Sequence, residues 1–246
     1  MAACGGVEGS LARSPYEFKP GPYSSHGLLL ASLPEAGQGR RVLDIGCGDG
    51  QLGALLAARG YRVTGIEMPG VIQVPFPENV ELVEADLDEG LPTLEARYDF
   101  VVCADVLEHL KAPERLLREL PLRMTPGARL AASLPNAVNI YVRLNVLLGR
   151  FPQHERGLFD RTHLHFYTWR GWVDLFTRAG FHIEKVAPTG IPFGLALRRF
   201  EETLPVRALE ALGYLAARWW KRLFAYQFVV VARTAPAGRL AAEGRG

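Results

Sequence analysis

Short apolar runs alternate with helical patterns along most of the chain. Seven runs have the length and composition of buried strands, at residues 41–46, 62–67, 80–84, 98–103, 128–134, 181–186 and 226–232. Between them, apolar residues recur every three or four positions and predict helices over 24–33, 51–59, 113–120, 138–148 and 169–179. Strands that alternate with helices at this spacing are joined by right-handed crossovers. The pattern therefore predicts an α/β fold around a mainly parallel sheet.

Four segments depart from this rhythm. Residues 1–23 are rich in Gly, Pro and Ala and are expected to form a mobile arm, and residues 235–246 a disordered tail, so that the folded domain covers 24–234. Two insertions, at about 135–167 and 190–225, interrupt the alternation. A long polar loop inside a compact domain is usually either functional or disordered.

Composition and charge narrow the class of protein. The chain carries 28 Lys and Arg against 26 Asp and Glu, a net charge of +2, which disfavours a protein that coats nucleic acid. No run approaches the roughly 20 apolar residues of a membrane-spanning helix, and the first residues lack a secretory signal. Three cysteines are too few for a disulfide framework. We therefore expect a cytoplasmic protein that does not act on nucleic acid.

The most informative stretch is VLDIGCGDG at residues 42–50. A strand ends there, glycines occupy alternate positions, and a helix follows, which lets a nucleotide-like ligand lie against the turn. Gly46 and Gly48 fit the first two positions of a dinucleotide fingerprint, but the third falls on Gln51. Asp44 would repel a pyrophosphate and attract a cationic ligand. This arrangement favours S-adenosylmethionine over a dinucleotide.

Acidic residues also stand at the ends of the next three predicted strands. Glu67 suits the two hydroxyls of a ribose, Asp86 suits an adenine amino group, and Asp105 lies at the carboxyl edge where open α/β sheets bind ligands. Taken alone, Asp86 is more simply a loop or capping acid. Together with Asp44, these three residues mark four consecutive strand ends.

The segments VLDIGCGDG, GIE, EADL and YDFVVCADVLEHL, in this order, resemble the motifs of the class I S-adenosylmethionine-dependent methyltransferases. SLPNAVN and FDRTHLHFYT are similar to the small-molecule group that includes ubiquinone-type O-methyltransferases and methionine-biosynthesis W-like proteins. The resemblance implies a Rossmann-like three-layer sandwich with strand order 3-2-1-4-5-7-6 and an antiparallel seventh strand. It also implies a set of residues that bind S-adenosylmethionine: Asp44, Gly46, Gly48, Glu67, Met68, Asp86, Leu87 and Asp105.

Three histidines are the candidate catalytic residues. His109 follows the fourth strand closely and serves either as a base or as a structural residue that fixes its loop. In an extended chain His163 and His165 would point the same way. They would either face an acceptor pocket or belong to a segment that only packs the insertion against the domain. Asn136, after the fifth strand, either holds a ligand or caps the following helix.

No metal is expected, but one alternative stays open. The spacing of Asp105, Glu108 and His109 is similar to the E-x-x-E-H of O-methyltransferases that hold a divalent cation. His163 or His165 would then complete a site of mixed oxygen and nitrogen ligands. The Asp in place of the first Glu departs from the pattern.

The resemblance implies methyl transfer to a small-molecule acceptor, most simply a hydroxyl of a quinone precursor, a sugar or glycolipid, or a polyketide-like compound. The alternatives are an N- or C-methyltransferase, or a cofactor-binding module that is active only with a partner. The fourth strand is followed by Ala-Asp-Val-Leu rather than the Asp/Asn-Pro-Pro-Tyr/Phe typical of exocyclic N-methylation in DNA.

Residues 205–224 form an amphipathic helical pattern. One stripe is apolar and the other is mostly cationic, with tryptophans between them. These features are typical of a helix that lies on a membrane surface, which for a cytoplasmic protein would be the inner membrane surface. They are equally typical of a helix packed on its own domain or on a second subunit.

Overall fold

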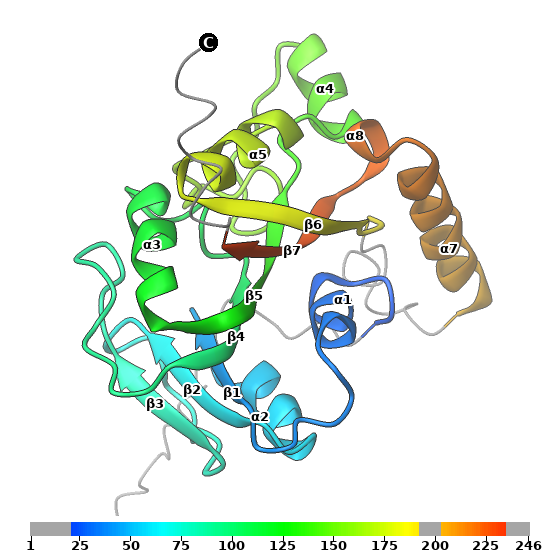
Figure 1. Ribbon diagram of the computed structural model, residues 1–246. Coiled ribbons are helices and arrows are strands. Elements are labelled where there is room, and N and C mark those ends of the chain that lie inside the picture. Colours follow the sequence, from blue (N-terminus) through cyan, green and yellow to red (C-terminus); the bar gives the residue numbers. More distant parts are fainter. Residues whose placement is uncertain (1–20, 192–202, 235–246) are drawn as a thin grey trace, which may run out of the picture.

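The computed structural model describes residues 21–191 and 203–234 (Figure 1). Seven strands form one sheet in the order β3-β2-β1-β4-β5-β7-β6. β7 runs antiparallel to both of its neighbours, and the other pairs are parallel. The predicted sheet order and the antiparallel seventh strand are confirmed. The strands are β1 (Arg41–Ile45), β2 (Arg62–Glu67), β3 (Val80–Glu84), β4 (Tyr98–Ala104), β5 (Met124–Pro135), β6 (Phe181–Pro188) and β7 (Gln227–Thr234).

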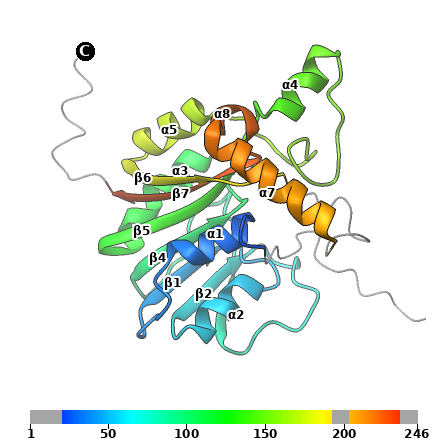
Figure 2. The ribbon, with the colours of Figure 1, turned by 90° about the vertical axis from the view of Figure 1, so that its right-hand side faces the viewer.

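Helices cover both faces of the sheet (Figure 2). α1 (Ser25–Ser32) and α2 (Gln51–Ala58) cover one face, while α3 (Pro113–Glu119) and α5 (Trp169–Arg178) cover the other. Neighbouring residues of one strand enter different cores, as Val101 and Val102 do, because successive strand side chains point to opposite faces. The result is the expected three-layer sandwich.

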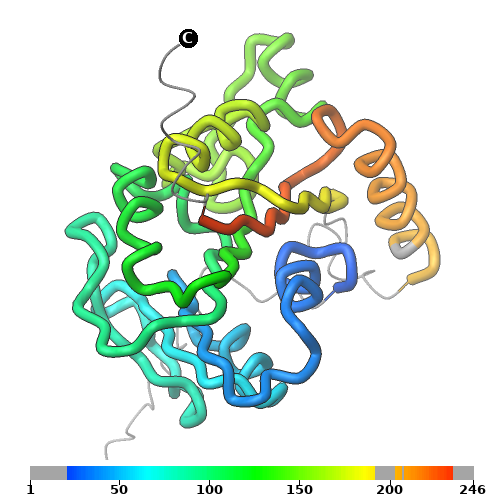
Figure 3. Tube along the Cα trace, in the orientation of Figure 1, coloured from blue at the N-terminus to red at the C-terminus, as the bar shows by residue number. Residues whose placement is uncertain are grey.

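The two insertions form separate helices at one end of the sheet. A short 3-10 helix, η1 (Leu120–Arg123), precedes β5, and α4 (Ile140–Leu147) follows it. The second insertion contributes α7 (Leu204–Trp219) and α8 (Lys221–Phe224). In the chain trace α4 extends away from the sheet (Figure 3). Within the described ranges, no helix is both long enough and apolar enough to span a bilayer.

Several predicted boundaries differ from the observed ones. β5 begins at Met124 rather than at 128, because Met124 pairs with Tyr98 ahead of an irregularity in the ladder. α4 begins at Ile140 rather than at 138, because the side chain of Asn139 accepts a hydrogen bond from the Tyr141 amide. The predicted helix 205–224 is divided at Trp220, which has φ −137° and ψ 76°.

Parts of the predicted domain scheme lie outside the described residues. These are residues 1–20 of the arm, residues 192–202 of the second insertion and the tail at 235–246. Residues 21–23 of the arm are described, and the ring of Tyr23 stacks on Tyr214 of α7 with the centroids 4.4 Å apart. This contact joins the residues before α1 to the second insertion.

Candidate active site

A cavity of about 760 Å³ opens at the carboxyl edge of the parallel strands. Its wall combines the glycine turn after β1, the ends of β2 and β4, the loop before α5 and the start of β7. Since β7 is antiparallel, its first residues lie at the same edge as the carboxyl ends of its neighbours. Segments from 44 to 227 therefore meet around one space.

The glycine turn forms one end of the cavity. Gly46 and Gly48 have φ angles of 65° and 55°, a conformation that favours glycine. A Cβ at Gly46 would lie 2.4 Å from Val106, whereas a Cβ at Gly48 would have no described atom within 4 Å. The Gly48 amide donates to Oε2 of Glu67 over 2.7 Å. The turn is thus packed behind Gly46 and open at Gly48, where a ligand can approach the backbone.

Asp44 lies beneath this turn and is 1% exposed. Burial, followed by the charge of Glu67, raises the pKa of its carboxyl to about 7. Its Oδ2 atom is buried and has no hydrogen-bond partner among residues 21–191 and 203–234. Two carboxyls that share a cavity in this way favour a cationic ligand, as the ammonium and sulfonium groups of S-adenosylmethionine would provide.

The other residues expected to bind the cofactor also line the cavity. Met68, Asp86 and Leu87 form its wall beside Glu67. The Met68 amide donates to Oε1 of Glu67, and Oδ1 of Asp86 accepts from the Asp88 amide, both over 2.9 Å. Asp86 therefore shapes its own loop and also faces the ligand space.

Asp105 has the left-handed φ of 55°. Its Oδ1 accepts from Nε2 of Gln227 over 2.8 Å and from the hydroxyl of Ser133, while its amide donates to that same hydroxyl. These contacts hold a non-glycine residue in a conformation that costs energy in an isolated chain. All eight predicted cofactor residues therefore surround one cavity.

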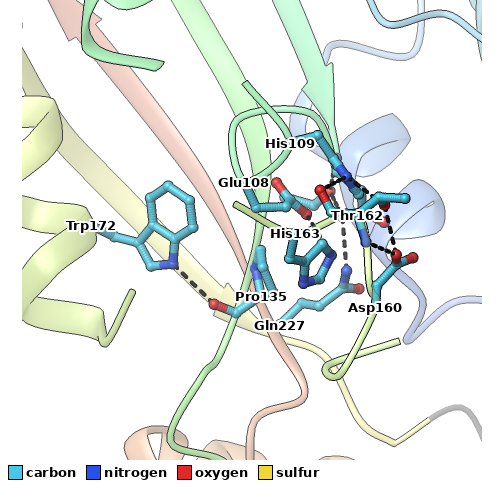
Figure 4. A network of polar contacts seen from close by, with 10 residues as sticks. Glu108, His109, Pro135, Asp160, Thr162, His163, Trp172 and Gln227 are labelled. Atoms are coloured by element: carbon cyan, nitrogen blue, oxygen red, sulfur yellow. Dashed lines mark hydrogen bonds and ion pairs between the residues drawn. The ribbon is translucent and has the colours of Figure 1, made fainter. Parts of the chain in front are cut away.

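Two of the three predicted histidines meet at the other side of the cavity (Figure 4). The rings of His109 and His163 lie 4.7 Å apart, and Nε2 of His163 lies 3.9 Å from Oε1 of Glu108, which is 1% exposed. Burial, followed by the charge of His109, lowers the pKa of His163 to about 4. His163 is consequently neutral at pH 7 and has a ring nitrogen able to accept a proton.

Thr162 and Asp160 orient His109. Nδ1 of His109 lies 3.2 Å from the carbonyl oxygen of Thr162, which can only accept, and 3.0 Å from the Thr162 hydroxyl, so Nδ1 is placed to donate a hydrogen bond to Thr162. The Thr162 hydroxyl donates to Oδ1 of buried Asp160 over 2.6 Å. The sequence analysis did not select this pair, because a threonine in a loop is not distinctive by itself.

His165 does not line the cavity. Its ring stacks on Tyr167 at 5.3 Å, and its buried Nε2 has no hydrogen-bond partner within the described chain. The amides of Leu164 and His165 both donate to the carbonyl of Glu108, so this segment is not the extended strand that the expectation required. The catalytic roles of the three histidines stay predictions.

Asn136 is fully buried and is not part of the cavity wall. Its Nδ2 donates to the carbonyl of Ala225 over 2.8 Å, and Asn139, not Asn136, caps α4. Tyr226 and Gln227 line the cavity and were not selected from the sequence. They could have been selected because they begin an antiparallel strand, whose first residues lie at the carboxyl edge of the parallel strands.

Comparisons with known proteins agree with this geometry. Residues 22–186 match a methyltransferase domain family. A ubiquinone biosynthesis O-methyltransferase of Aeromonas salmonicida is 37% identical over 105 residues, which are 40% of this chain and 44% of that protein. A ribosomal RNA small subunit methyltransferase C of Chromohalobacter salexigens is 36% identical over 114 residues, covering 42% and 34%. The match thus spans less than half the length of these curated relatives.

Solved structures show the same fold. An S-adenosylmethionine-dependent methyltransferase from Mesorhizobium loti superposes with a TM-score of 0.57 at 19% identity, over 85% of this chain and 98% of that one. A Burkholderia thailandensis N1-methyltransferase with bound S-adenosylhomocysteine gives 0.53 at 18% identity, over 86% and 77%. The buried carboxyl, the open glycine turn and the family match together confirm the predicted cofactor. The chain belongs to the class I S-adenosylmethionine-dependent methyltransferases.

Proposed function

We propose that this enzyme transfers the methyl group of S-adenosylmethionine to a hydroxyl of a small-molecule acceptor. The observation that carries the proposal is the group formed by Glu108, His109 and His163, which shares one cavity with the glycine turn. The similarity to a ubiquinone biosynthesis O-methyltransferase supports transfer to oxygen.

The bound cofactor supplies an electrophilic methyl group on a positively charged sulfur. An acceptor hydroxyl must then lose its proton as its oxygen bonds to the methyl carbon and the carbon–sulfur bond breaks. Neutral His163 accepts that proton at a ring nitrogen, and the charges of Asp160 and Asp105 favour the resulting imidazolium, while Oε1 of buried Glu108 lies 3.9 Å from Nε2 of His163. His109, oriented through Thr162, contacts the His163 ring and limits its rotation.

A divalent cation is a second way to use the same side chains. The ligand atoms of Glu108, His109 and His163 all lie within 4.8 Å of one another. One oxygen and two imidazole nitrogens suit a transition metal better than an ion that prefers only oxygen. Asp105, part of the alternative metal set drawn from the sequence, is not a member of this group and bonds to Ser133 and Gln227 instead.

An acceptor panel tests the proposal. Purified enzyme with radiolabelled S-adenosylmethionine is offered catechol, aniline and thiophenol, each with excess chelator or with added Mg²⁺, Mn²⁺ or Zn²⁺. We expect label in catechol at the highest rate, and a loss of that rate of about 10²-fold or more in His163→Ala. The matched control is His182→Ala, an exposed histidine on β6.

The outcomes separate the candidates. Transfer that survives chelation supports His163 as the base, whereas transfer restored only by a divalent ion supports the metal. Faster labelling of aniline would contradict O-methylation in favour of an N-methyltransferase. Binding of S-adenosylhomocysteine without transfer to any acceptor would support a module that requires a partner.

A further inference from the structure

The helix α4 exposes apolar side chains on most of its circumference. Leu144, Val146 and Leu147 are 51%, 55% and 81% exposed, and Leu148 and Phe151, directly after the helix, are 67% and 53% exposed. Helices of a folded domain normally bury such a stripe. Figures 1 and 3 show that α4 projects beyond the sheet and its covering helices, so these side chains form a convex tip.

Both charged residues of the segment 140–151 are arginines, and the next acid along the chain, Glu155, pairs with Arg161. Arg143, within α4, and Arg150, after it, are both exposed. The sequence contains no Asp or Glu from residue 120 to residue 154. Exposed Lys221 and Arg222 of α8 lie next to the base of α4, because Asn139 donates to the carbonyls of Phe224 and Ala225.

The neighbouring helix adds exposed aromatic residues. Trp219 and Trp220, at the junction of α7 and α8, are 81% and 53% exposed. α7 buries Val206 and Ala217, whereas Leu212 of the apolar stripe noted in the sequence is 63% exposed. The apolar side of α7 is therefore only partly covered, since Leu209 is also 41% exposed.

We propose that α4, together with the junction of α7 and α8, binds the surface of an anionic lipid bilayer. The apolar tip enters the boundary between headgroups and acyl chains, the tryptophans lie at headgroup depth, and the cations contact anionic lipid. Charge complementarity and the convex shape favour a bilayer over a second copy of this chain, which would bring like charges together. The inference concerns binding alone and does not depend on the acceptor chemistry.

Co-sedimentation with vesicles tests this proposal. We expect the full chain to sediment with phosphatidylcholine vesicles that contain phosphatidylglycerol at low salt, and to be released by high salt or in pure phosphatidylcholine. The double variant L147E/L148E should weaken binding at least tenfold, and R143Q and R150Q about fivefold each. The matched control is L122E, which changes an exposed leucine (69%) on η1, at the other end of β5.

Circular dichroism and calorimetry with S-adenosylhomocysteine establish that each variant is folded. Absence of sedimentation with anionic vesicles at low salt would overturn the proposal, and so would equal loss in L122E. Light scattering measures the oligomeric state and so tests the alternative of a second copy of the chain. If the wild type is a dimer that L147E/L148E dissociates, the tip binds a second copy and not a bilayer.

Discussion

Gln227 donates a hydrogen bond from its Nε2 to Oδ1 of Asp105 across 2.8 Å, although 122 residues separate them in the sequence. Gln227 opens the antiparallel strand β7, and Asp105 follows the parallel strand β4. The bond fastens the cofactor side of the cavity to the last strand of the sheet. It also helps to hold Asp105 at its positive φ.

Replacing Gln227 by leucine should therefore affect stability as well as binding. The change leaves a partly buried carboxylate oxygen with one donor fewer, which costs about 1 kcal/mol. Each kcal/mol corresponds to about 2–4 °C in the unfolding temperature of a domain of this size. Thermal unfolding of Gln227→Leu beside Gln73→Leu, an exposed control, measures the effect. Equal unfolding temperatures would show that the bond contributes nothing.

The two glycines of the turn should respond differently to alanine. Both substitutions place a side chain at a positive φ, which costs about 1–2 kcal/mol. Gly46→Ala also meets Val106 at 2.4 Å and should be the less stable variant, partly rescued by Val106→Ala. Gly48→Ala directs its methyl group into open cavity and should mainly weaken binding of S-adenosylhomocysteine.

Gly127→Ala is the control for the turn, because Gly127 has φ 81° and open surroundings outside the cavity. Gly127→Ala should lower the unfolding temperature as much as Gly48→Ala does, and should leave the affinity for S-adenosylhomocysteine unchanged. A Gly48→Ala protein that binds S-adenosylhomocysteine as tightly as Gly127→Ala does would contradict the role of the turn.

Asp44→Asn should stabilise the free protein while it removes cofactor binding. The pKa of Asp44 is raised from 3.8 to about 7, so between pH 4 and 7 the unfolded state releases a proton that the folded state keeps. Stability from this group falls as pH rises through that window and stays reduced above it. At pH 8 the amide should therefore raise the unfolding temperature, whereas exposed Asp174→Asn should leave it unchanged. An unfolding temperature at pH 8 no higher than that of wild type would refute this account.

Affinity for S-adenosylmethionine should increase as pH rises toward 7. A cationic ligand prefers the ionised carboxyl, and the ionised fraction grows about tenfold per unit well below the pKa. Calorimetry in buffers of different ionisation enthalpy should detect one proton released on binding near pH 6 and little release at pH 8. The same proton count at both values would argue against Asp44 as the linked group.

His163 and His165 should separate by the kind of defect they cause. His163 lines the cavity, so His163→Ala should lower turnover about 10²-fold or more and leave the affinity for S-adenosylhomocysteine within twofold. His165 stacks on Tyr167 outside the cavity wall, so His165→Ala should lower the unfolding temperature and leave turnover near wild type. Equal turnover in the two variants would contradict this division.

The residues on the cofactor side of the cavity could be predicted from the sequence because each motif there is a short continuous segment. A buried strand, its terminal carboxyl and the following turn are neighbours in the chain, as Asp44 and Gly48 are. The order of the parallel strands follows from the resemblance of these motifs. The placement of all eight residues around one cavity then follows from the edge they share.

The contacts on the acceptor side of the cavity could not be predicted from the sequence, because they join segments that are far apart in the chain. His163 meets Glu108 only after the loop before α5 folds back on β4, and Gln227 enters from β7. Likewise, the apolar pattern of α4 and α7 indicated helices but not which side of each is buried. Burial there depends on Gly190 and other residues that pack against the backbone of α7.

The position of β7 between β5 and β6 has a consequence for how the enzyme is made. The turn, Glu67, Asp86 and Asp105 all precede β5 in the sequence, whereas β7 pairs between β5 and β6 and is the last strand of the described chain. Tyr226 and Gln227 complete the cavity wall, and Ala225 anchors Asn136 and Asn139 at the base of α4. During synthesis, the residues that bind the cofactor thus leave the ribosome well before β7 does. The cavity wall is complete only once β7 has paired with β5 and β6.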